Sequence, residues 1–186
     1  MRSELAAGQL LLAAPELLDP NFVDTVVLLL DVNDEGALGV VLNRPTALPV
    51  SEVLGDWGDV VDEPEVLFQG GPVSTDGALA VALAAPGGEN AAGFQALWDR
   101  VGLLDLDTPR ELVEGTVDRL RIFAGYAGWG AGQLEAEIAE GSWYVVPGMV
   151  DDVFRGDVRD LRRRVLRRQP GDLALHATRP VDPELN

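Results

Sequence analysis

The sequence contains no cysteine, no lysine and a single histidine, His176. Without cysteine there can be no disulfide, thiolate nucleophile, thiolate metal ligand or thiol redox sensor. Without lysine, lysine-dependent catalysis is excluded, and so is a phosphate-binding P-loop, which requires that residue. One histidine is too few for a typical zinc site, and no Gly-x-Ser-x-Gly motif accompanies it, so a Ser-His-Asp triad is not expected. The sequence therefore identifies no catalytic residue and predicts no cofactor and no bound metal, although oxygen ligands for Mg²⁺ or Mn²⁺ are abundant.

Long apolar runs are also missing. The chain contains no run of about 18 apolar residues, the length from which a membrane-spanning helix is inferred. The apolar run 10–14 ends at Pro15 and Glu16 and is too short for a signal peptide. We therefore expect a soluble, cytoplasmic protein that does not contact a membrane. The length of 186 residues fits one domain over residues 1–186, with a core that needs no disulfide or metal.

Positive charge is scarce and concentrated in one segment. The net charge is −17, and all fourteen basic residues are arginine. Residues 1–154 carry six arginines against 26 acids, a balance of −20, whereas residues 155–168 carry seven arginines against two acids, a balance of +5. An acidic body repels phosphate backbones, so nucleic acid is not an expected partner.

The basic segment has the pattern of an amphipathic helix over about 157–168. Asp157 is a suitable N-cap, and Val158, Leu161 and Val165 recur at helical spacing. The arginines of this helix should either face solvent or pair with the acidic body. A last strand is expected at 173–178, before a C-terminal tail.

Short apolar runs bounded by turn residues predict a sheet. The runs 25–30 and 37–42 flank a turn-forming segment and should pair as an antiparallel hairpin. A calcium loop starting at Asp31 is the alternative, but its twelfth position is Leu42, where a bidentate glutamate is needed. The expected fold class is α+β: a strongly curved, barrel-like sheet, largely antiparallel or mixed, with helices packed on its outside. The predicted strands are 8–14, 25–30, 37–42, 65–69, 79–85, 119–126 and 143–146.

Three shorter segments carry weaker signals. Pro45 should end the strand before it and force the chain to turn. The second half of 97–104 is favoured as a strand, and a short helix capped by Thr108 should run to about residue 114. Trp57, in an acidic loop, should fold back over the core.

The stretch 121–143 is the richest in information. It predicts a buried strand, a glycine loop and a short helix, with glycines at positions 125, 128, 130 and 132. The glycine spacing does not match the dinucleotide-binding pattern G-x-G-x-x-G. Gln133, Glu137 and Glu140 share one helical face, which could hold a cation, an amine or a basic partner, or could be solvated. Trp129 could be a stacking platform or a plug that packs the loop onto the core, and the plug is favoured.

Four motifs stand out along the chain: Ala13-Ala14-Pro15, the segment GALGVVLNRP at 36–45, Gly70-Gly71-Pro72-Val73 and the stretch 121–143. With these motifs the sequence resembles the YqgE/AlgH family almost from end to end. The resemblance implies a compact α+β cytoplasmic bacterial protein, often labelled a transcriptional regulator, whose biochemical activity is not settled. The two adjacent glycines of the third motif should permit close approach of the backbone to another loop.

Three functions are compatible with the sequence. The first is a non-catalytic regulatory or binding protein that takes a small molecule or a protein partner, as a monomer or weak dimer. The second is a hydrolase or transferase that uses paired carboxylates, with or without Mg²⁺. The third is a DNA-binding regulator, as the family label suggests, although 162–168 has no asparagine or glutamine to read adenine. The residues assigned to the binding surface are Asn43, Arg44, Gly70, Gly71, Tyr126, Gly128, Trp129, Gly130, Gln133 and Glu137.

We predict that the protein does not bind duplex DNA specifically at physiological salt, because residues 1–154 carry a charge balance of −20. Fluorescence anisotropy with genomic fragments would check this. A submicromolar complex that survives competitor DNA would contradict the prediction.

Overall fold

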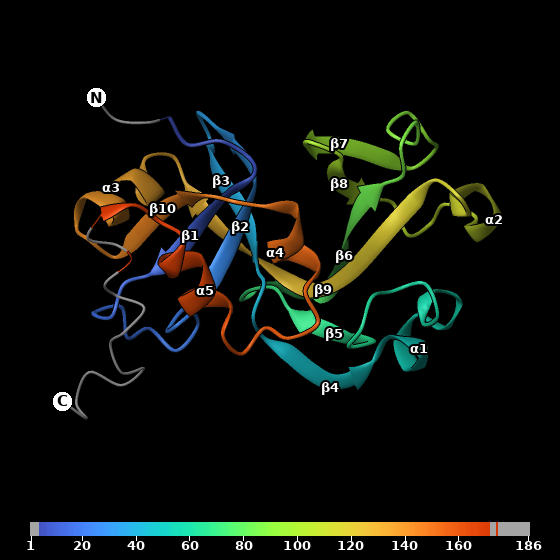
Figure 1. Cartoon of the computed structure of the whole chain (residues 1–186), viewed down its shortest axis with the longest axis horizontal. Coiled ribbons are helices and arrows are strands. Elements are labelled where there is room, and N and C mark those ends of the chain that lie inside the picture. The colour runs from blue at the N-terminus through green and yellow to red at the C-terminus, as the bar shows by residue number, and fades with distance from the viewer. Residues whose placement is uncertain (1–3, 172–173, 175–186) are drawn as a thin grey trace.

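The computed structural model describes residues 4–171 and residue 174. Ten strands form one curled, mostly antiparallel sheet, and helices pack on its outside (Figure 1). The α+β class and the curved sheet predicted from the sequence are confirmed. In the described part of the chain, no helix is long and apolar enough to cross a membrane.

The main path of the sheet runs in the order β10-β1-β2-β3-β9-β6-β8-β7, and each neighbouring pair is antiparallel. β4 pairs with β5, and β5 pairs in parallel with β9. The strands are β1 (Gln9–Ala13), β2 (Val26–Asn33), β3 (Gly36–Val41), β4 (Pro45–Pro49), β5 (Val66–Gln69), β6 (Val73–Ala84), β7 (Phe94–Trp98), β8 (Val101–Leu104), β9 (Val117–Gly130) and β10 (Trp143–Pro147). The helices are α1 (Val50–Val53), the 3₁₀ turn η1 (Gly55–Trp57), α2 (Arg110–Val113), α3 (Gln133–Ala139), α4 (Val150–Phe154) and α5 (Leu161–Arg167).

The hairpin predicted for residues 25–42 is formed by β2 and β3. Val27 opposes Val41 and Asn33 opposes Gly36, so the chain reverses within a tight turn. The calcium-loop alternative is wrong, because residues 31–33 and 36–38 of that loop are paired with each other in the two strands.

Both halves of the sheet are built on β9. Its residues 117–126 pair with β6 and its residues 127–130 pair with β3, so the strand runs through the whole molecule (Figure 1). At Gly125 the backbone takes a left-handed φ of 74°, and a Cβ atom there would lie 2.5 Å from the carbonyl oxygen of Gly71. A side chain is excluded at this crossing, so glycine is required.

The predicted glycine loop is wrong. Gly128 and Gly130 lie inside β9, and Gly132, with a φ of 74°, forms the turn into α3. The burial pattern explains the difference, because Ala127 and Trp129 are buried whereas the two strand glycines between and after them are exposed. Pairing with β3 thus decides the local structure against the low strand propensity of glycine.

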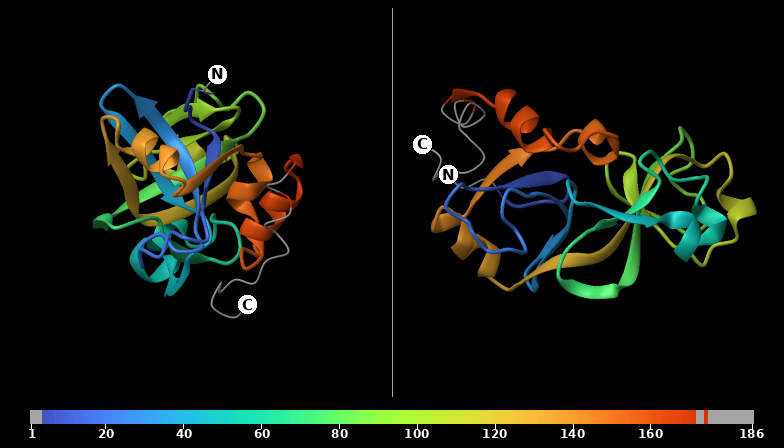
Figure 2. Two further views of the ribbon diagram at one scale, coloured as in Figure 1. Left: turned by 90° about the vertical axis from the view of Figure 1, so that its left-hand side faces the viewer. Right: turned by 90° about the horizontal axis from the view of Figure 1, so that it is seen from below.

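Nearly all residues of β1 are apolar because both faces of the sheet are covered at this strand. Leu10 and Leu12 pack on one side with buried residues of α4 and α5, whereas Leu11 and Ala13 pack on the other side with Leu134 of α3. This separation reflects the alternation of side chains along a strand. Figure 2 shows α4 and α5 on one side of these strands and α3 on the other.

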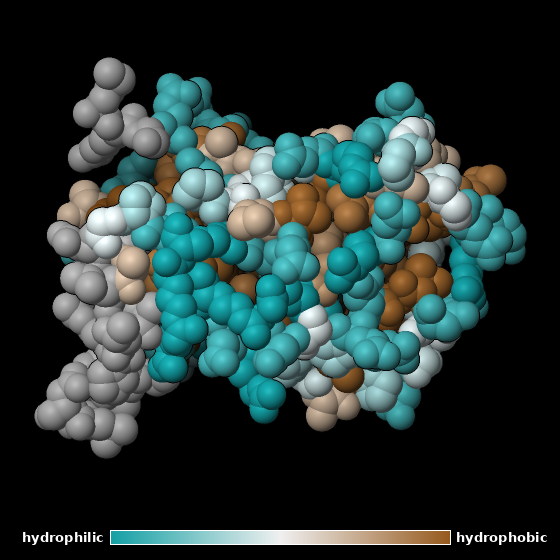
Figure 3. Space-filling model, viewed as in Figure 1, coloured by the Kyte–Doolittle hydropathy of each residue, from teal (hydrophilic) through white to brown (hydrophobic). Residues whose placement is uncertain are grey.

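The sheet curls until the end of β7 reaches the residue before β1. Trp98, at the end of β7, packs on Gly8, where a Cβ atom would lie 2.3 Å from the indole ring. Trp57 folds back over the core as predicted and is 5% exposed, in an apolar cluster with residues of β6, β8 and β9. In the view of Figure 1 the surface over α5 is hydrophilic, and apolar side chains show at the centre of the molecule and in its right-hand half (Figure 3).

Of three further local predictions, one is confirmed and two differ from the structure. The strand predicted for the second half of 97–104 is β8, which forms a hairpin with β7. Pro45 follows the end of β3 but begins β4, where its missing N–H is tolerated because β4 pairs only with β5. α2 begins at Arg110 with no side-chain cap, so Thr108 does not cap it.

The arginine-rich helix is shorter than predicted. α5 begins at Leu161, and Asp157 accepts a hydrogen bond from the main-chain N–H of Arg159 (3.2 Å) in a turn that precedes the helix. The strand predicted at 173–178, which contains His176, lies outside the described residues except for Ala174.

Arg121 of β9 is buried, with an exposed fraction of 1%. Its Nη1 donates to the carbonyls of Val153 and Arg155 (3.1 and 2.8 Å), and its Nη2 donates to the carbonyl of Glu63 (2.7 Å). The guanidinium also lies 4.3 Å from the ring centroid of Phe68, a cation–π contact. Burial lowers the pKa of Arg121 to about 10, which still leaves the group charged at neutral pH. Arg121 therefore fastens α4 and the segment before β5 to the sheet.

We predict that Arg121→Leu lowers the free energy of unfolding by about 3 kcal/mol, because buried carbonyls lose their donors. Urea unfolding would measure the loss. Arg159→Leu is the control, since the Arg159 side chain is 89% exposed and its pair with Asp157 is a surface contact, so its urea midpoint should barely move. Equal midpoints for the two variants would contradict the prediction.

Candidate functional site

The structure separates the predicted binding-surface residues into two groups. The first group lies where the chain after β5 crosses β9. Gly70 donates its N–H to Ala124 (2.8 Å) and accepts from the N–H of Val41 (2.9 Å). A Cβ atom on Gly71 would lie 2.2 Å from the main chain of Tyr126. The close approach predicted for the two glycines is confirmed.

Asn43 and Arg44, also of the first group, hold the loop between β1 and β2. Asn43 accepts from the N–H of Val26 (3.1 Å) and donates to the carbonyl of Asp24 (3.0 Å). The guanidinium of Arg44 donates to three main-chain carbonyls of the same loop, at Pro20, Asn21 and Val23 (3.1, 2.7 and 3.1 Å). These donors are therefore engaged within the chain.

The second group surrounds the carboxylate of Glu137 on α3. Its Oε1 accepts from the indole Nε1 of Trp129 (3.1 Å) and of Trp143 (3.0 Å), and its Oε2 accepts from Nε2 of Gln133 (2.9 Å). Oε1 of Gln133 in turn accepts from the N–H of Gly130 (3.0 Å). Trp143 is not among the residues assigned to the binding surface from the sequence, because a tryptophan at the start of an apolar strand carries no functional signal of its own.

Trp129 has the geometry of the plug. It is 6% exposed, and its ring lies 6.1 Å from that of Phe22 and 6.1 Å from that of Trp143, with Phe22 and Trp143 5.5 Å apart. These contacts leave no open aromatic face between the three rings. Together with Glu137 they fix α3 on the sheet.

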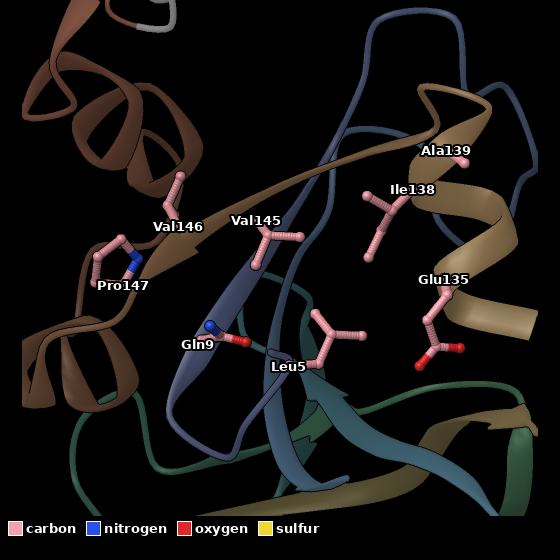
Figure 4. Close-up of a pocket in the computed structure, with 8 residues that line it drawn as sticks. All are labelled: Leu5, Gln9, Glu135, Ile138, Ala139, Val145, Val146 and Pro147. Atoms are coloured by element: carbon pink, nitrogen blue, oxygen red, sulfur yellow. The ribbon is translucent and has the colours of Figure 1, made fainter. Parts of the chain in front are cut away.

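A pocket lies on the other side of α3, and we call it the α3 pocket. Its volume is about 430 Å³, and its walls come from α3, from β10 and from the segment that leads into β1 (Figure 4). No motif marks these residues, which lie far apart in the sequence and come together only in the fold. The lining residues are Leu5, Gln9, Glu135, Ile138, Ala139, Val145, Val146 and Pro147.

The wall formed by residues 4–9 is held by its own hydrogen bonds. Oε1 of Gln9 accepts from the N–H of Ala6 (2.9 Å), and its Nε2 donates to the carbonyl of Glu4 (3.3 Å). Gly8 donates its N–H to the carbonyl of Leu29 (2.9 Å). The opposite wall, α3, is held by Glu137, so both walls of the pocket are fixed by contacts within the chain.

Two of the five arginines at 162–168 are engaged by the body of the protein. Arg162 donates through Nε and Nη2 to the carbonyl of Ala13 (3.0 and 2.6 Å), and burial lowers its pKa. Arg168 forms a two-pronged ion pair with the buried carboxylate of Asp152, whose hydrogen bonds raise the pKa of Arg168. The predicted pairing of arginines with the acidic body is present at Arg168.

We predict that Glu137→Ala lowers the free energy of unfolding by about 2 kcal/mol, because two largely buried indole N–H groups lose their acceptor. Glu137→Gln keeps one acceptor oxygen and should lose less than half of that amount. Glu140→Ala, which removes an exposed acid next to the end of the same helix, should leave stability unchanged. Urea unfolding would compare the three, and a Glu137→Ala midpoint equal to that of Glu140→Ala would show that the carboxylate does not hold α3.

Comparison with known proteins places the chain in a family. The model of a family described as AlgH-like matches residues 10–174. A UPF0301 protein of Streptomyces coelicolor is 56% identical over 183 residues, covering 96% of this chain and 94% of the relative. A UPF0301 protein of Mycobacterium tuberculosis is 43% identical over 178 residues, covering 95% and 88%.

Two solved structures share the fold. A crystal structure of a protein from Corynebacterium diphtheriae superposes with a TM-score of 0.90 at 31% identity, covering 96% of this chain and 95% of the other. The solution structure of the AlgH protein from Pseudomonas aeruginosa gives a TM-score of 0.70 at 28% identity, covering 97% and 98%. Since the likeness in sequence and in fold extends over almost the whole chain, the protein belongs to the AlgH-like family.

Proposed function

We propose that the protein is a non-catalytic, regulatory binding protein that takes a small organic ligand in the α3 pocket. The observation that carries the proposal is the pocket itself, a hollow of about 430 Å³ with mainly apolar walls and two polar side chains. Small-molecule sites in proteins typically have this size and this lining. In this proposal the protein acts in the cytoplasm as a monomer or weak dimer, and ligand binding governs its contact with a protein partner.

The preformed walls support this function. Binding costs less free energy when the groups that contact a ligand are ordered beforehand. α3 is held through Glu137, and the segment 4–9 is held through the amide of Gln9. The sequence placed the binding surface around Gln133 and Glu137. In this proposal those residues hold α3 on the sheet, and a different side of the same helix lines the pocket.

The two alternative functions find less support in the geometry. A hydrolase with paired carboxylates would need two acids in one cavity, whereas Glu135 is the single acid that lines the α3 pocket. A DNA-binding regulator would present the arginines at 162–168 to the DNA. Two of these five arginines, Arg162 and Arg168, already bind the carbonyl of Ala13 and the carboxylate of Asp152, and the balance of −20 over residues 1–154 repels a phosphate backbone.

We predict that Ala139→Phe abolishes the binding of a neutral apolar probe, 1-hexanol, because the added ring fills the α3 pocket. Two-dimensional amide NMR of the wild type should show hexanol-dependent shifts confined to α3, β10 and residues 4–9. Ala136→Phe is the matched control, since Ala136 is exposed on the same helix but does not line the pocket, and it should bind hexanol like the wild type.

The same titration can contradict the proposed function. Wild-type shifts that are absent, or that scatter over the surface and persist in Ala139→Phe, would show that the α3 pocket does not receive ligands.

A further inference from the structure

We propose that the ligand of the α3 pocket is a small organic ammonium ion with an apolar body, and that the carboxylate of Glu135 binds its charged group. This inference rests on the proposed function, because it names the chemical class of ligand for the same pocket.

The first observation is the state of the two polar side chains that line the pocket. Gln9 uses its amide within its own segment, accepting from Ala6 and donating to Glu4. Glu135 differs, because within residues 4–171 and residue 174 no hydrogen bond or ion pair involves its carboxylate. A carboxylate only accepts hydrogen bonds, so the group that it recognises must be a donor and is best a cation.

The contrast within α3 sharpens this assignment. Glu137, two residues further along, already accepts three hydrogen bonds from protein side chains on the sheet side of the helix. Glu135 lies on the pocket side together with Ile138 and Ala139. The helix therefore carries one acid that fixes its position and one that remains available to a ligand.

The second observation is the placement of the apolar walls. Figure 4 shows the side chains of Leu5, Ile138 and Val145 approaching one space from three different elements, with the carboxylate of Glu135 extending from α3 at its side. A ligand that fills the space with hydrocarbon and places an ammonium group at Glu135 satisfies both surfaces at once. Each methylene that enters should tighten binding by up to about fourfold.

The field of the whole protein acts in the same direction. The chain carries a net charge of −17, so cations are attracted and anions are repelled at long range. An anionic ligand with the same hydrocarbon body would be repelled both by this field and by the Glu135 carboxylate.

The test compares three probes of nearly equal size on the full chain: hexylammonium, 1-hexanol and hexanoate. NMR titration at low salt should give binding that is about two- to fivefold tighter for hexylammonium than for hexanol, and weaker for hexanoate than for hexanol. The preference should shrink as sodium chloride is added. Glu135→Gln should reduce it to the small preference that the net charge of the chain gives, whereas Glu140→Gln, which makes the same charge change next to the end of the same helix, should retain it in full.

A variant with the opposite charge at position 135 provides a second, independent test. Glu135→Arg should reverse the preference, so that hexanoate binds more tightly than hexylammonium, and an unchanged melting temperature would show that the variant is folded. Hexylammonium still preferred in Glu135→Arg, or equal binding of all three probes to the wild type, would overturn the ammonium assignment while the pocket stands. Binding of none of the three would overturn the pocket itself.

Discussion

The rest of the structure depends on the crossing between β9 and the segment Gly70–Gly71. A Cβ atom on Gly70 would lie 2.3 Å from the carbonyl oxygen of Gly125. Glycine is therefore needed on both segments at this crossing, because a side chain on either would keep the two backbones apart. At this point β9 changes partners: β3 and β5 share one of its edges and β6 takes the other. A larger residue at Gly125 would separate these strands, and with them the two halves of the sheet.

The site follows from the way β9 ends. Only two residues separate β9 from α3, so the strand sets the helix directly on one face of the sheet. Glu137 then joins α3 to Trp129 of β9 and to Trp143 of β10 through two indole hydrogen bonds. Because a helix turns about 100° per residue, Glu135 and Ala139, each two residues from Glu137, are left on the side away from this junction. A seven-residue helix thus has one side that is structural and one that lines a cavity.

Sequence patterns that depend only on residues close together in the chain predicted the local structure well. The β2–β3 hairpin and the close approach at Gly70–Gly71 each follow from a local requirement, whether a turn or the absence of a side chain. The prediction of a glycine loop was wrong. A high glycine content indicates a turn, but pairing with β3 makes residues 127–130 a strand. The helical face of Gln133 and Glu137 was expected to bind a cation, an amine or a basic partner, or to be solvated, whereas Glu137 accepts hydrogen bonds from Trp129 and Trp143. The sequence does not show that Trp143 approaches this face. The α3 pocket could not be predicted, because its walls are brought together by the fold alone.

Three arginines of this acidic chain act as clamps within the fold. Arg44, Arg121 and Arg162 all donate to main-chain carbonyls, and two of these guanidiniums bridge carbonyls of more than one residue. A guanidinium has five donors in a planar fork and stays charged in partly buried sites, whereas an ammonium has three donors and loses its proton more readily on burial. Arginine suits this role of binding several main-chain carbonyls inside the fold better than lysine does. The clamped charges contribute little to recognition at the surface, where the acids dominate. For this reason the field around the pocket favours a cationic ligand and opposes a phosphate backbone.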